Sequence, residues 1–179
     1  MSQQARRVIV QKMAMNNLAA KTNTLPHDHG GCVLAALDTA ELLCRERGLR
    51  FTAIRRRVLE LVWDSHKPIG AYDILEALGR ESGSAAPPTV YRALDFLIEA
   101  GLVHRLDSLN AFVGCPDPAN RHAGQFLICT QCRTVTELSD PDIERLITRK
   151  AADGGFAAVR QMLEIEGLCN VCRTSPQNA

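Results

Sequence analysis

Apolar residues recur at helical spacing through the first half of the chain, in four segments separated by short polar or proline-containing breaks. Three of these segments are followed by a glycine, whose backbone freedom suits it to a helix C-terminus, and Thr52 is a suitable N-cap for the second. The first predicted helix runs from near Val33 to the residue before Gly48, and the second from the residue after Thr52 to the residue before His66. The third runs from near Ala71 to Leu78, and the fourth from Pro87 to the residue before Gly101.

Two short extended runs follow the fourth predicted helix and indicate a β-hairpin. They cover residues 102–106 and 111–113, and the polar residues 107–110 separate them. Helices followed by a hairpin form the element order of a winged helix-turn-helix domain. Other small helical domains share this order, so the pattern indicates a winged helix without proving it.

The second half of the chain mixes strand and helix patterns. Strands are predicted at 125–128, 135–138 and 157–164, and a helix is predicted at 142–152. The predicted fold class is therefore α+β, with an N-terminal winged helix-turn-helix domain followed by a small C-terminal α/β domain.

The N-terminal region differs from the rest of the chain. Residues 1–30 show no steady apolar period, so a flexible lead with room for a short helix is expected there, and Met13 or Met15 is an alternative natural start. No apolar run approaches the ~18–20 residues of a membrane helix, and the N-terminus lacks a secretory signal pattern. A cytoplasmic protein with no membrane partner is expected.

Composition and charge add little to this picture. The chain has 46% hydrophobic and 23% charged residues, as is typical of a soluble globular protein, and its net charge is +1. The small surplus of basic residues lies toward the N-terminal part, where residues 45–105 hold ten Lys and Arg against eight Asp and Glu. Charge alone therefore gives no reason to predict DNA binding.

The seven cysteines carry the strongest chemical signal in the sequence. Four of them form two Cys-x-x-Cys pairs, Cys129 with Cys132 and Cys169 with Cys172, separated by 36 residues. Each pair can offer two thiolates to one tetrahedral ion, so the two pairs together predict a closed, structural zinc site. The alternative is two redox pairs, but a redox motif of this type normally occurs once, in a βαβ context.

A second group of possible metal ligands remains after these four cysteines are assigned. His104, Cys115, His122 and Glu137 offer imidazole, thiolate and carboxylate, which together suit zinc. They are spread over the helical half, the connector and the distal half, so an ion that held all four would fix the orientation of the two halves. That arrangement would be a sensor; the alternative is that these are ordinary surface residues.

Longer motifs resemble the ferric-uptake-regulator family, and most closely its zinc-uptake-regulator branch. The resemblance rests on the segments 71–75 (Ala-Tyr-Asp-Ile-Leu) and 87–97 (Pro-Pro-Thr-Val-Tyr-Arg-Ala-Leu-Asp-Phe-Leu) and on the two cysteine pairs, and it covers residues 33–173. It implies a homodimer that binds a palindromic, AT-rich operator in double-stranded DNA when loaded with zinc, and that represses zinc-import genes.

The resemblance also assigns roles to single positions. It implies that Cys129, Cys132, Cys169 and Cys172 hold a structural zinc ion. It implies that His104, Cys115, His122 and Glu137 hold a regulatory one, giving two Zn²⁺ per chain. Tyr72 and Arg92 match DNA-contacting positions of the family.

The fourth predicted helix is the candidate recognition helix, because its first turn carries Thr89, Tyr91 and Arg92. Arginine can donate two hydrogen bonds to guanine, and the ring of Tyr72 can pack on a thymine methyl. Burial in the core is the alternative for Tyr91. Residues 55–57 are three consecutive arginines, of which one or two can reach phosphates unless they form an ordinary solvated face.

Two departures from the family pattern bear on specificity. The run from His122 to Cys129 replaces the His-His-Asp-His run usual in iron- and peroxide-sensing branches, which favours zinc. Glu76 holds the acidic position of a pair that can link neighbouring dimers on DNA, but the arginine position is Gly79, with Arg80 next to it. Cooperative binding of two dimers is therefore left open.

Other hypotheses remain beside this one. The same scaffold can sense iron, manganese, nickel or peroxide, or the chain can be a winged-helix module without a sensor. A zinc hydrolase with Glu137 as its base is a further alternative, but the sequence has no His-Glu-x-x-His motif, so the chain is predicted not to be an enzyme. Cys32 and Cys44 are interpreted as small buried residues, although His27, His29 and Cys32 can form a third metal site.

These inferences give a domain plan. The predicted ranges are a flexible lead at 1–30, a winged-helix DNA-binding domain at 31–113, a hinge at 114–122, a dimerisation and zinc-binding domain at 123–173, and a tail at 174–179.

Overall fold

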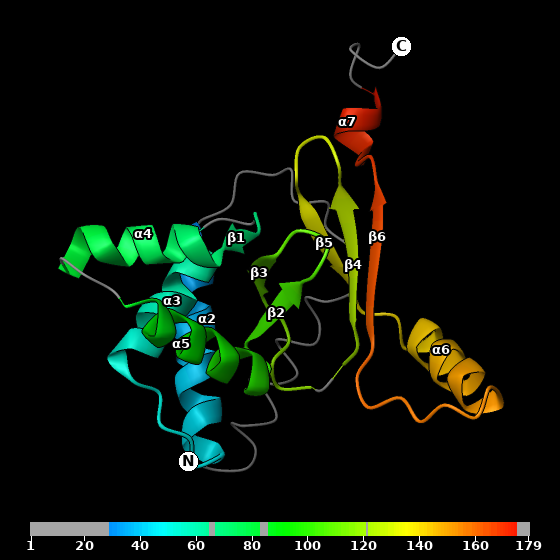
Figure 1. The fold of residues 1–179 in the computed structure, drawn as a ribbon, viewed down its shortest axis with the longest axis horizontal. Coiled ribbons are helices and arrows are strands. Elements are labelled where there is room, and N and C mark those ends of the chain that lie inside the picture. The colour runs from blue at the N-terminus through cyan, green and yellow to red at the C-terminus, as the bar shows by residue number, and fades with distance from the viewer. Residues whose placement is uncertain (1–28, 65–66, 83–85, 121, 175–179) are drawn as a thin grey trace.

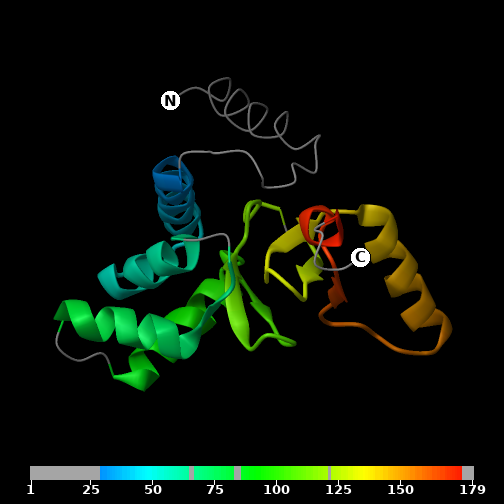
Figure 2. The ribbon, with the colours of Figure 1, turned by 90° about the horizontal axis from the view of Figure 1, so that it is seen from above.

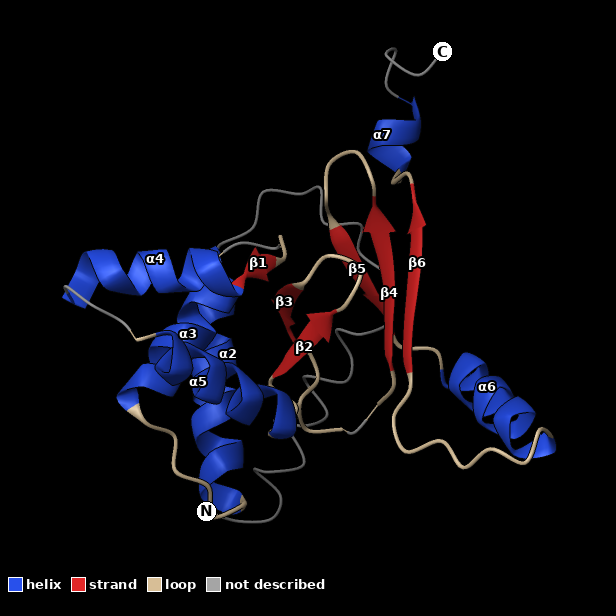
Figure 3. Cartoon of the chain, viewed as in Figure 1, coloured by secondary structure: helices blue, strands red, loops and turns tan. Residues whose placement is uncertain are grey.

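The computed structural model describes residues 29–64, 67–82, 86–120 and 122–174. The predicted lead and tail therefore lie almost wholly outside the described residues. The described elements form an N-terminal helical half and a C-terminal sheet half, which confirms the predicted α+β class (Figure 3). Within the described ranges, no helix is long and apolar enough to cross a membrane.

Four helices form the N-terminal half, as the apolar periodicity predicts. They are α2 (His29–Glu46), α3 (Ala53–Trp63), α4 (Ala71–Ser82) and α5 (Pro87–Glu99). The extended backbone of Thr52 precedes α3 at the N-cap position, but its side chain makes no capping hydrogen bond. Helix α2 begins four residues earlier than the sequence pattern indicates, and it includes the low-propensity pair Gly30 and Gly31.

The predicted glycine stops are correct for two helices and wrong for one. Gly101 has a φ of +74°, and the amide of Leu102 donates to the carbonyl of Leu97 at 2.8 Å, so α5 ends in a Schellman motif. Helix α4 instead runs through Gly79 to Ser82. A glycine costs a helix only about 1 kcal/mol relative to alanine, which the neighbouring turns can outweigh.

The core of the N-terminal half is formed by side chains on the facing sides of these helices. Its most deeply buried members come from every helix but also from the strand that follows α5. They include Ala40, Val58, Leu59, Ile74, Val90, Leu94, Leu97 and Val103.

A small antiparallel sheet completes this half. Strands β2 (Val103–Leu106) and β3 (Ala111–Gly114) form the predicted hairpin, the wing of a winged helix. Its turn is closed by the amide of Asn110, which donates to the carbonyl of Asp107 at 3.3 Å, and Asn110 has a φ of 47°. The two-residue strand β1 (Ile69–Gly70), which the sequence pattern does not predict, pairs with β3.

The C-terminal half is a three-stranded sheet in the order β5-β4-β6. Strand β4 (Gly124–Cys129) is central, β5 (Val135–Leu138) pairs with it antiparallel, and β6 (Met162–Gly167) pairs with it parallel. Helix α6 (Pro141–Asp153) connects β5 to β6, and α7 (Asn170–Thr174) follows β6.

The third predicted strand, at 157–164, is placed wrongly. The ladder with β4 begins only at Met162, opposite Gly124, and continues to Gly167. Residues 157–160 are exposed and outside the sheet, because β4 offers no backbone partner before its first residue.

The two halves lie side by side, with the hairpin of β2 and β3 between the helices and the C-terminal sheet (Figure 1). A view from above shows the same order, with α6 on the far side of that sheet from the helical half (Figure 2). A small apolar cluster joins the hairpin to the sheet through buried Leu106, Phe126 and Ile128. The wing therefore belongs to the core of both halves.

Candidate metal centres and nucleic-acid interface

The two cysteine pairs meet at one end of the C-terminal sheet. Cys129 ends β4 and Cys132 lies in the turn that follows, whereas Cys169 follows β6 and Cys172 lies in α7. One sulfur from each lies within 4.8 Å of the other three, and the Sγ atoms of Cys132 and Cys169 are 3.7 Å apart. Four thiolates at about 2.3 Å from a tetrahedral zinc ion would be about 3.8 Å from one another. The arrangement therefore fits a zinc ion.

Backbone hydrogen bonds shape this cluster around the sulfurs. Arg133, with a φ of 60°, lets the chain turn back so that its amide donates to the carbonyl of Cys129 at 2.9 Å. The amide of Cys169 donates to Sγ of Cys129, and the amide of Cys172 donates to Sγ of Cys169, each at 3.4 Å. Such bonds stabilise negative charge on sulfur.

The acidities of the thiols reflect this environment. Amide donors from Cys132 and then Cys169 lower the pKa of Cys129 to about 6, and Thr134 lowers the pKa of Cys132. Burial, followed by the neighbouring cysteines, raises the pKa of Cys172 to about 12. The cluster thus favours some thiolates but opposes four together, so a cation is needed to hold all four in the deprotonated form. All seven cysteines are free thiols, so the pairs are not disulfides.

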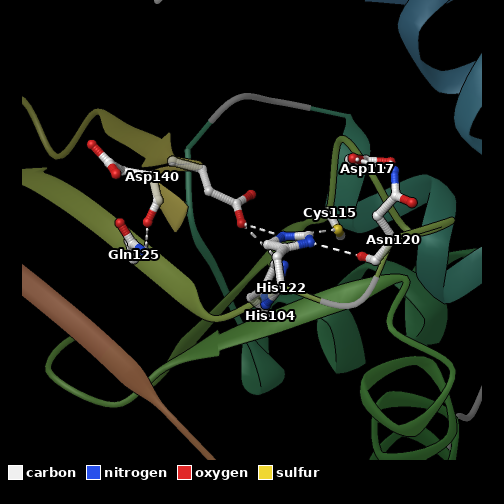
Figure 4. A network of polar contacts seen from close by, with 8 residues as sticks. His104, Cys115, Asp117, Asn120, His122, Gln125 and Asp140 are labelled. Carbon is white, nitrogen blue, oxygen red and sulfur yellow. Dashed lines mark hydrogen bonds and ion pairs between the residues drawn. The ribbon is translucent and has the colours of Figure 1, made fainter. Parts of the chain in front are cut away.

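The second group of predicted ligands also comes together, at the junction of the two halves. His104 lies on β2, Cys115 follows β3, His122 lies in the connector and Glu137 lies on β5. One donor atom from each lies within 4.8 Å of the other three, and all four side chains are largely buried. Figure 4 shows His104, Cys115 and His122 gathered at this point.

The distances within this interdomain cluster suit a cation. Nε2 of His122 is 3.7 Å from Sγ of Cys115 and 2.7 Å from Oε1 of Glu137, and Nε2 of His104 is 3.4 Å from the same Oε1. Nε2 of His104 and Oε2 of Glu137 are buried and make no hydrogen bond. Buried polar atoms without partners are costly, and a shared metal ion would satisfy both. The donor set and these two orphaned atoms fit zinc.

A layer of polar groups behind the cluster orients His122. Its Nδ1 lies 2.9 Å from the carbonyl oxygen of Asn120, so Nδ1–H donates to that oxygen and Nε2 is directed into the cluster (Figure 4). The side-chain amide of Asn120 donates in turn to both carboxylate oxygens of Asp117, at 3.1 and 2.9 Å. His104 is held differently, with its ring edge against Phe126 at a centroid distance of 5.3 Å.

Without a metal ion, the electrostatics of the cluster favour a proton. Burial lowers the pKa of His104, so this ring is neutral and ready to act as a ligand. Contacts with Cys115 and then Glu137 raise the pKa of His122 to about 11, while burial raises the pKa of the Cys115 thiol. The cluster therefore holds a positive charge at the place where a metal ion would supply one.

The connector that carries two of these ligands is tied to the end of α5. The guanidinium of Arg47 donates to the carbonyl of Ala100, at 2.6 Å, and to that of Pro118, at 3.2 Å. The amide of Cys115 donates to the carbonyl of Leu102 at 3.0 Å. A shift of the connector would therefore be transmitted to the C-terminus of α5.

The predicted DNA-contacting residues lie on exposed faces of α4 and α5. Tyr72 is 78% exposed and Tyr91 is 43% exposed, so the alternative of burial for Tyr91 is wrong. Thr89 and Arg92 are also exposed, whereas Val90 on the same helix is buried. Among the described residues, Arg92 has no ion pair with a carboxylate, which leaves its guanidinium available for a ligand.

The three consecutive arginines of α3 are engaged within the protein instead. Arg56 pairs with Glu41 and Glu60, and Arg57 pairs with Glu60 at 2.7 Å and with Glu81 at 2.5 Å. The guanidinium of Arg55 lies 3.5 Å from the ring centroid of Phe96. These contacts favour a structural role over the predicted phosphate contacts.

Three further predictions concern residues outside both clusters. Cys44 is buried in the helical core, whereas Cys32 is only half-buried and lines a cavity of about 230 Å³ together with Trp63 and Cys115. The third metal site stays untested, because His27 and the side chain of His29 lie outside the described residues. On α4, Glu76 pairs with Arg80 at 3.1 Å within the same helix.

The sequence of this chain is similar to those of known proteins. Residues 46–166 match the sequence pattern of the ferric uptake regulator family. The zinc uptake regulation protein of Escherichia coli (strain K12) is 40% identical over 139 residues, which are 76% of this chain and 80% of that protein. The ferric uptake regulation protein of Bordetella parapertussis is 34% identical, over 76% of this chain and 96% of that protein.

Solved structures show the same likeness in three dimensions. Holo XcZur matches with a TM-score of 0.73 and 45% identity, over 79% of this chain and 99% of that one. A zinc uptake regulator complexed with zinc and DNA matches with a TM-score of 0.75 and 38% identity, over 79% of this chain and 95% of that one. The fold, the extent of the match and the identity agree: this chain belongs to the ferric uptake regulator family.

Proposed function

We propose that this chain is a zinc-responsive transcriptional repressor, which binds palindromic operator DNA as a zinc-loaded homodimer and controls zinc uptake genes. One observation carries the proposal. His104 of the wing, Cys115 and His122 of the connector and Glu137 of the C-terminal sheet place their donor atoms within 4.8 Å of one another. Relatives named for zinc uptake regulation, one of them complexed with zinc and DNA, support the same function.

The two clusters have different roles in this proposal, with one zinc ion each. The four cysteines form a closed site, which would tie the end of β4 to the segment after β6 and so stabilise the sheet. The interdomain cluster offers a single thiolate, and it would bind zinc less tightly and in exchange with its surroundings. The thiolate of Cys115 favours zinc over iron, manganese or nickel, for which nitrogen and oxygen ligands alone would be more typical.

Zinc at the interdomain cluster would act by selecting one orientation of the two halves. We assign the winged-helix domain to residues 31–113, the hinge to 114–122 and the dimerisation and zinc-binding domain to 123–173. Since the ligands are shared among these parts, zinc binds tightly only when the wing, the hinge and the sheet approach one another. The free energy of zinc binding would thereby stabilise one orientation of the DNA-binding domain relative to the dimerisation domain.

The DNA interface would be formed by α5 and the start of α4. Helix α5 presents Thr89, Tyr91 and Arg92 in and near its first turn, where a recognition helix meets base edges in the major groove. Arg92 is placed to donate to a guanine, and Tyr72 to pack on a thymine methyl. Arg47 links the other end of α5 to the hinge, so a movement of the metal ligands in the hinge would shift the recognition helix.

A second copy of the chain would cover the C-terminal half. Helix α6 buries none of its residues, although its sequence has an apolar side that includes Leu146, which is 48% exposed. On the sheet, Leu127 and Ile165 are 38% and 44% exposed. These apolar groups fit a homodimer interface, and a dimer also matches a palindromic operator. We place the protein in the cytoplasm, where free thiols persist and DNA is accessible.

The test combines metal content with operator binding at buffered zinc. The wild-type protein is expected to hold two zinc ions per chain, one resistant to mild chelation and one exchangeable, and to bind operator DNA only when both sites are filled. Cys115→Ser should lose the exchangeable ion and the zinc-dependent DNA binding, while the matched control Cys32→Ser keeps both. DNA binding by Cys115→Ser that is unchanged at all zinc levels would refute the sensor and leave a passive winged-helix module. If iron, manganese or nickel promoted operator binding by the wild-type protein at a lower concentration than zinc does, that ion would replace zinc as the proposed signal.

A further inference from the structure

A second polar contact holds the wing to the C-terminal sheet, away from the metal ligands. The carboxylate of Glu164, on β6, accepts hydrogen bonds from the amides of Asp107, at 2.7 Å, and Ser108, at 3.1 Å, with one oxygen for each. These amides begin the turn of the hairpin, and neither is needed for the hydrogen bond that closes this turn. Burial alone would raise the pKa of Glu164, but hydrogen bonds from Ser108 and Asp107 outweigh it and hold the pKa below its ordinary value.

This contact lies in the same row of the sheet as the metal ligand. Glu137 on β5 and Glu164 on β6 both pair with Phe126 on the central strand, so the three side chains point to the same face. Glu137 meets His104, near the start of β2. Phe126 packs against the ring of His104 and clusters with Leu106, at the end of β2. Glu164 then holds the turn that follows, so the row Glu137–Phe126–Glu164 contacts the wing along its length.

We propose that Glu164 is a positioning residue, which holds the turn of the wing (residues 107–110) against the C-terminal sheet. It thereby strengthens both zinc binding at the interdomain cluster and operator binding. This inference rests on the proposed function. Zinc needs His104 and Glu137 at the same place, and the bonds from Glu164 favour the docking that brings them there. Two contacts that stabilise one arrangement strengthen each other, and the gain is reciprocal.

The chain offers variants that separate this role from general stability. Glu164→Gln keeps the size of the side chain but places an amide donor against a backbone donor. Glu166→Gln is the matched control, because Glu166 lies on the same strand, is exposed and has no side-chain hydrogen bond or ion pair within the described part of the chain. Ser108→Pro removes the amide and the hydroxyl that Ser108 offers to Glu164, and it keeps both Glu164 and the amide of Asp107. Residue 108 is the second position of the turn, where proline is favoured.

The experiment measures three quantities on the full-length protein: hydrogen exchange at residues 107 and 108, zinc affinity of the exchangeable site by competition with a chelator, and operator affinity. Glu164→Gln should increase exchange at the two amides and weaken exchangeable zinc binding roughly tenfold. Operator binding should then need more zinc and recover at saturation. Ser108→Pro should weaken zinc binding less, and Glu166→Gln should match wild type. The four-cysteine zinc should stay bound in every variant.

Two results would overturn the proposal. One is exchangeable zinc affinity in Glu164→Gln equal to that of wild type. The other is a loss that extends equally to the four-cysteine zinc and the melting temperature, which would indicate a general structural role. If wild type failed to bind DNA in response to zinc, the proposed function would fall. The zinc and exchange measurements would still decide the role of Glu164.

Discussion

Gly114 permits close packing between the helical core and the first residue of the connector, and an added methyl group there should be costly. A Cβ atom at this position would lie 2.2 Å from Cε2 and from Nε1 of the Trp63 indole, and 2.7 Å from Cζ2. Carbon atoms in contact normally lie about 3.5–4.0 Å apart, so the indole or the strand must move by roughly 1.5 Å. The next residue is Cys115, so a movement of the strand would displace this member of the interdomain cluster.

Gly114→Ala should therefore lower the free energy of unfolding by about 1–3 kcal/mol, as overpacked cores do. For a domain of this size, that loss corresponds to a melting temperature roughly 5–20 °C lower. Exchangeable zinc should also bind more weakly, whereas the four-cysteine zinc should be retained. Thermal unfolding followed by the fluorescence of Trp63, the only tryptophan, measures the first effect, and chelator competition measures the second.

Gly79→Ala is the matched control for this variant. A Cβ at Gly79 meets no atom within 4 Å, and the residue lies inside α4, so alanine should be neutral or should stabilise the protein by up to about 1 kcal/mol. A Gly114→Ala protein that melts with wild type and binds zinc equally well would show that Trp63 and the connector can separate at no cost. Close packing of Gly114 against Trp63 would then contribute nothing to stability or to zinc binding.

Two further outcomes follow from the proposed sites. Arg92→Ala should weaken binding to a specific operator by about 1–3 kcal/mol and leave both zinc ions bound, as fluorescence anisotropy and elemental analysis would show; unchanged operator affinity would contradict the assigned contact. Zinc affinity at the interdomain cluster should rise with pH, because the pKa values of His122, about 11, and of Cys115 are both raised without metal, and their protons must leave when zinc binds. Below these pKa values, each proton that zinc displaces raises the zinc affinity roughly tenfold per pH unit. Calorimetry in buffers of different ionisation enthalpy counts the displaced protons. A zinc affinity that stayed constant from about pH 6 to 8 would be incompatible with this ligand set.

The features predicted well from the sequence are those fixed by local spacing. The helical period is visible within each helix, and each Cys-x-x-Cys pair places two candidate zinc ligands within four residues. The candidate ligands of the interdomain cluster are far apart in the chain, so their spacing gave only a weak indication, and the family resemblance was needed to group them.

Other features depend on contacts that no local pattern records. The strand β1 has two residues, too few to show alternation, and the start of β6 is set by where β4 begins, so the apolar residues 157–159 were taken for strand although they are exposed. Asn120 and Glu164 look like ordinary polar residues in the sequence. Their roles follow from the tertiary structure, which places Asn120 behind His122 and Glu164 beneath the wing.

The parallel pairing of β4 with β6 has a consequence for the order in which the protein acquires its metals. The crossover through α6 makes this pairing non-local, and the four cysteines close it at the end where Cys129 pairs with Gly167, two residues before Cys169. Until this end of β4 and β6 is held together, the face of the C-terminal sheet that packs against the wing would be incomplete. If the two clusters have the proposed roles, a newly made chain would take up the four-cysteine zinc ion in order to finish folding, and only the ion at the interdomain cluster would report how much zinc the cell contains.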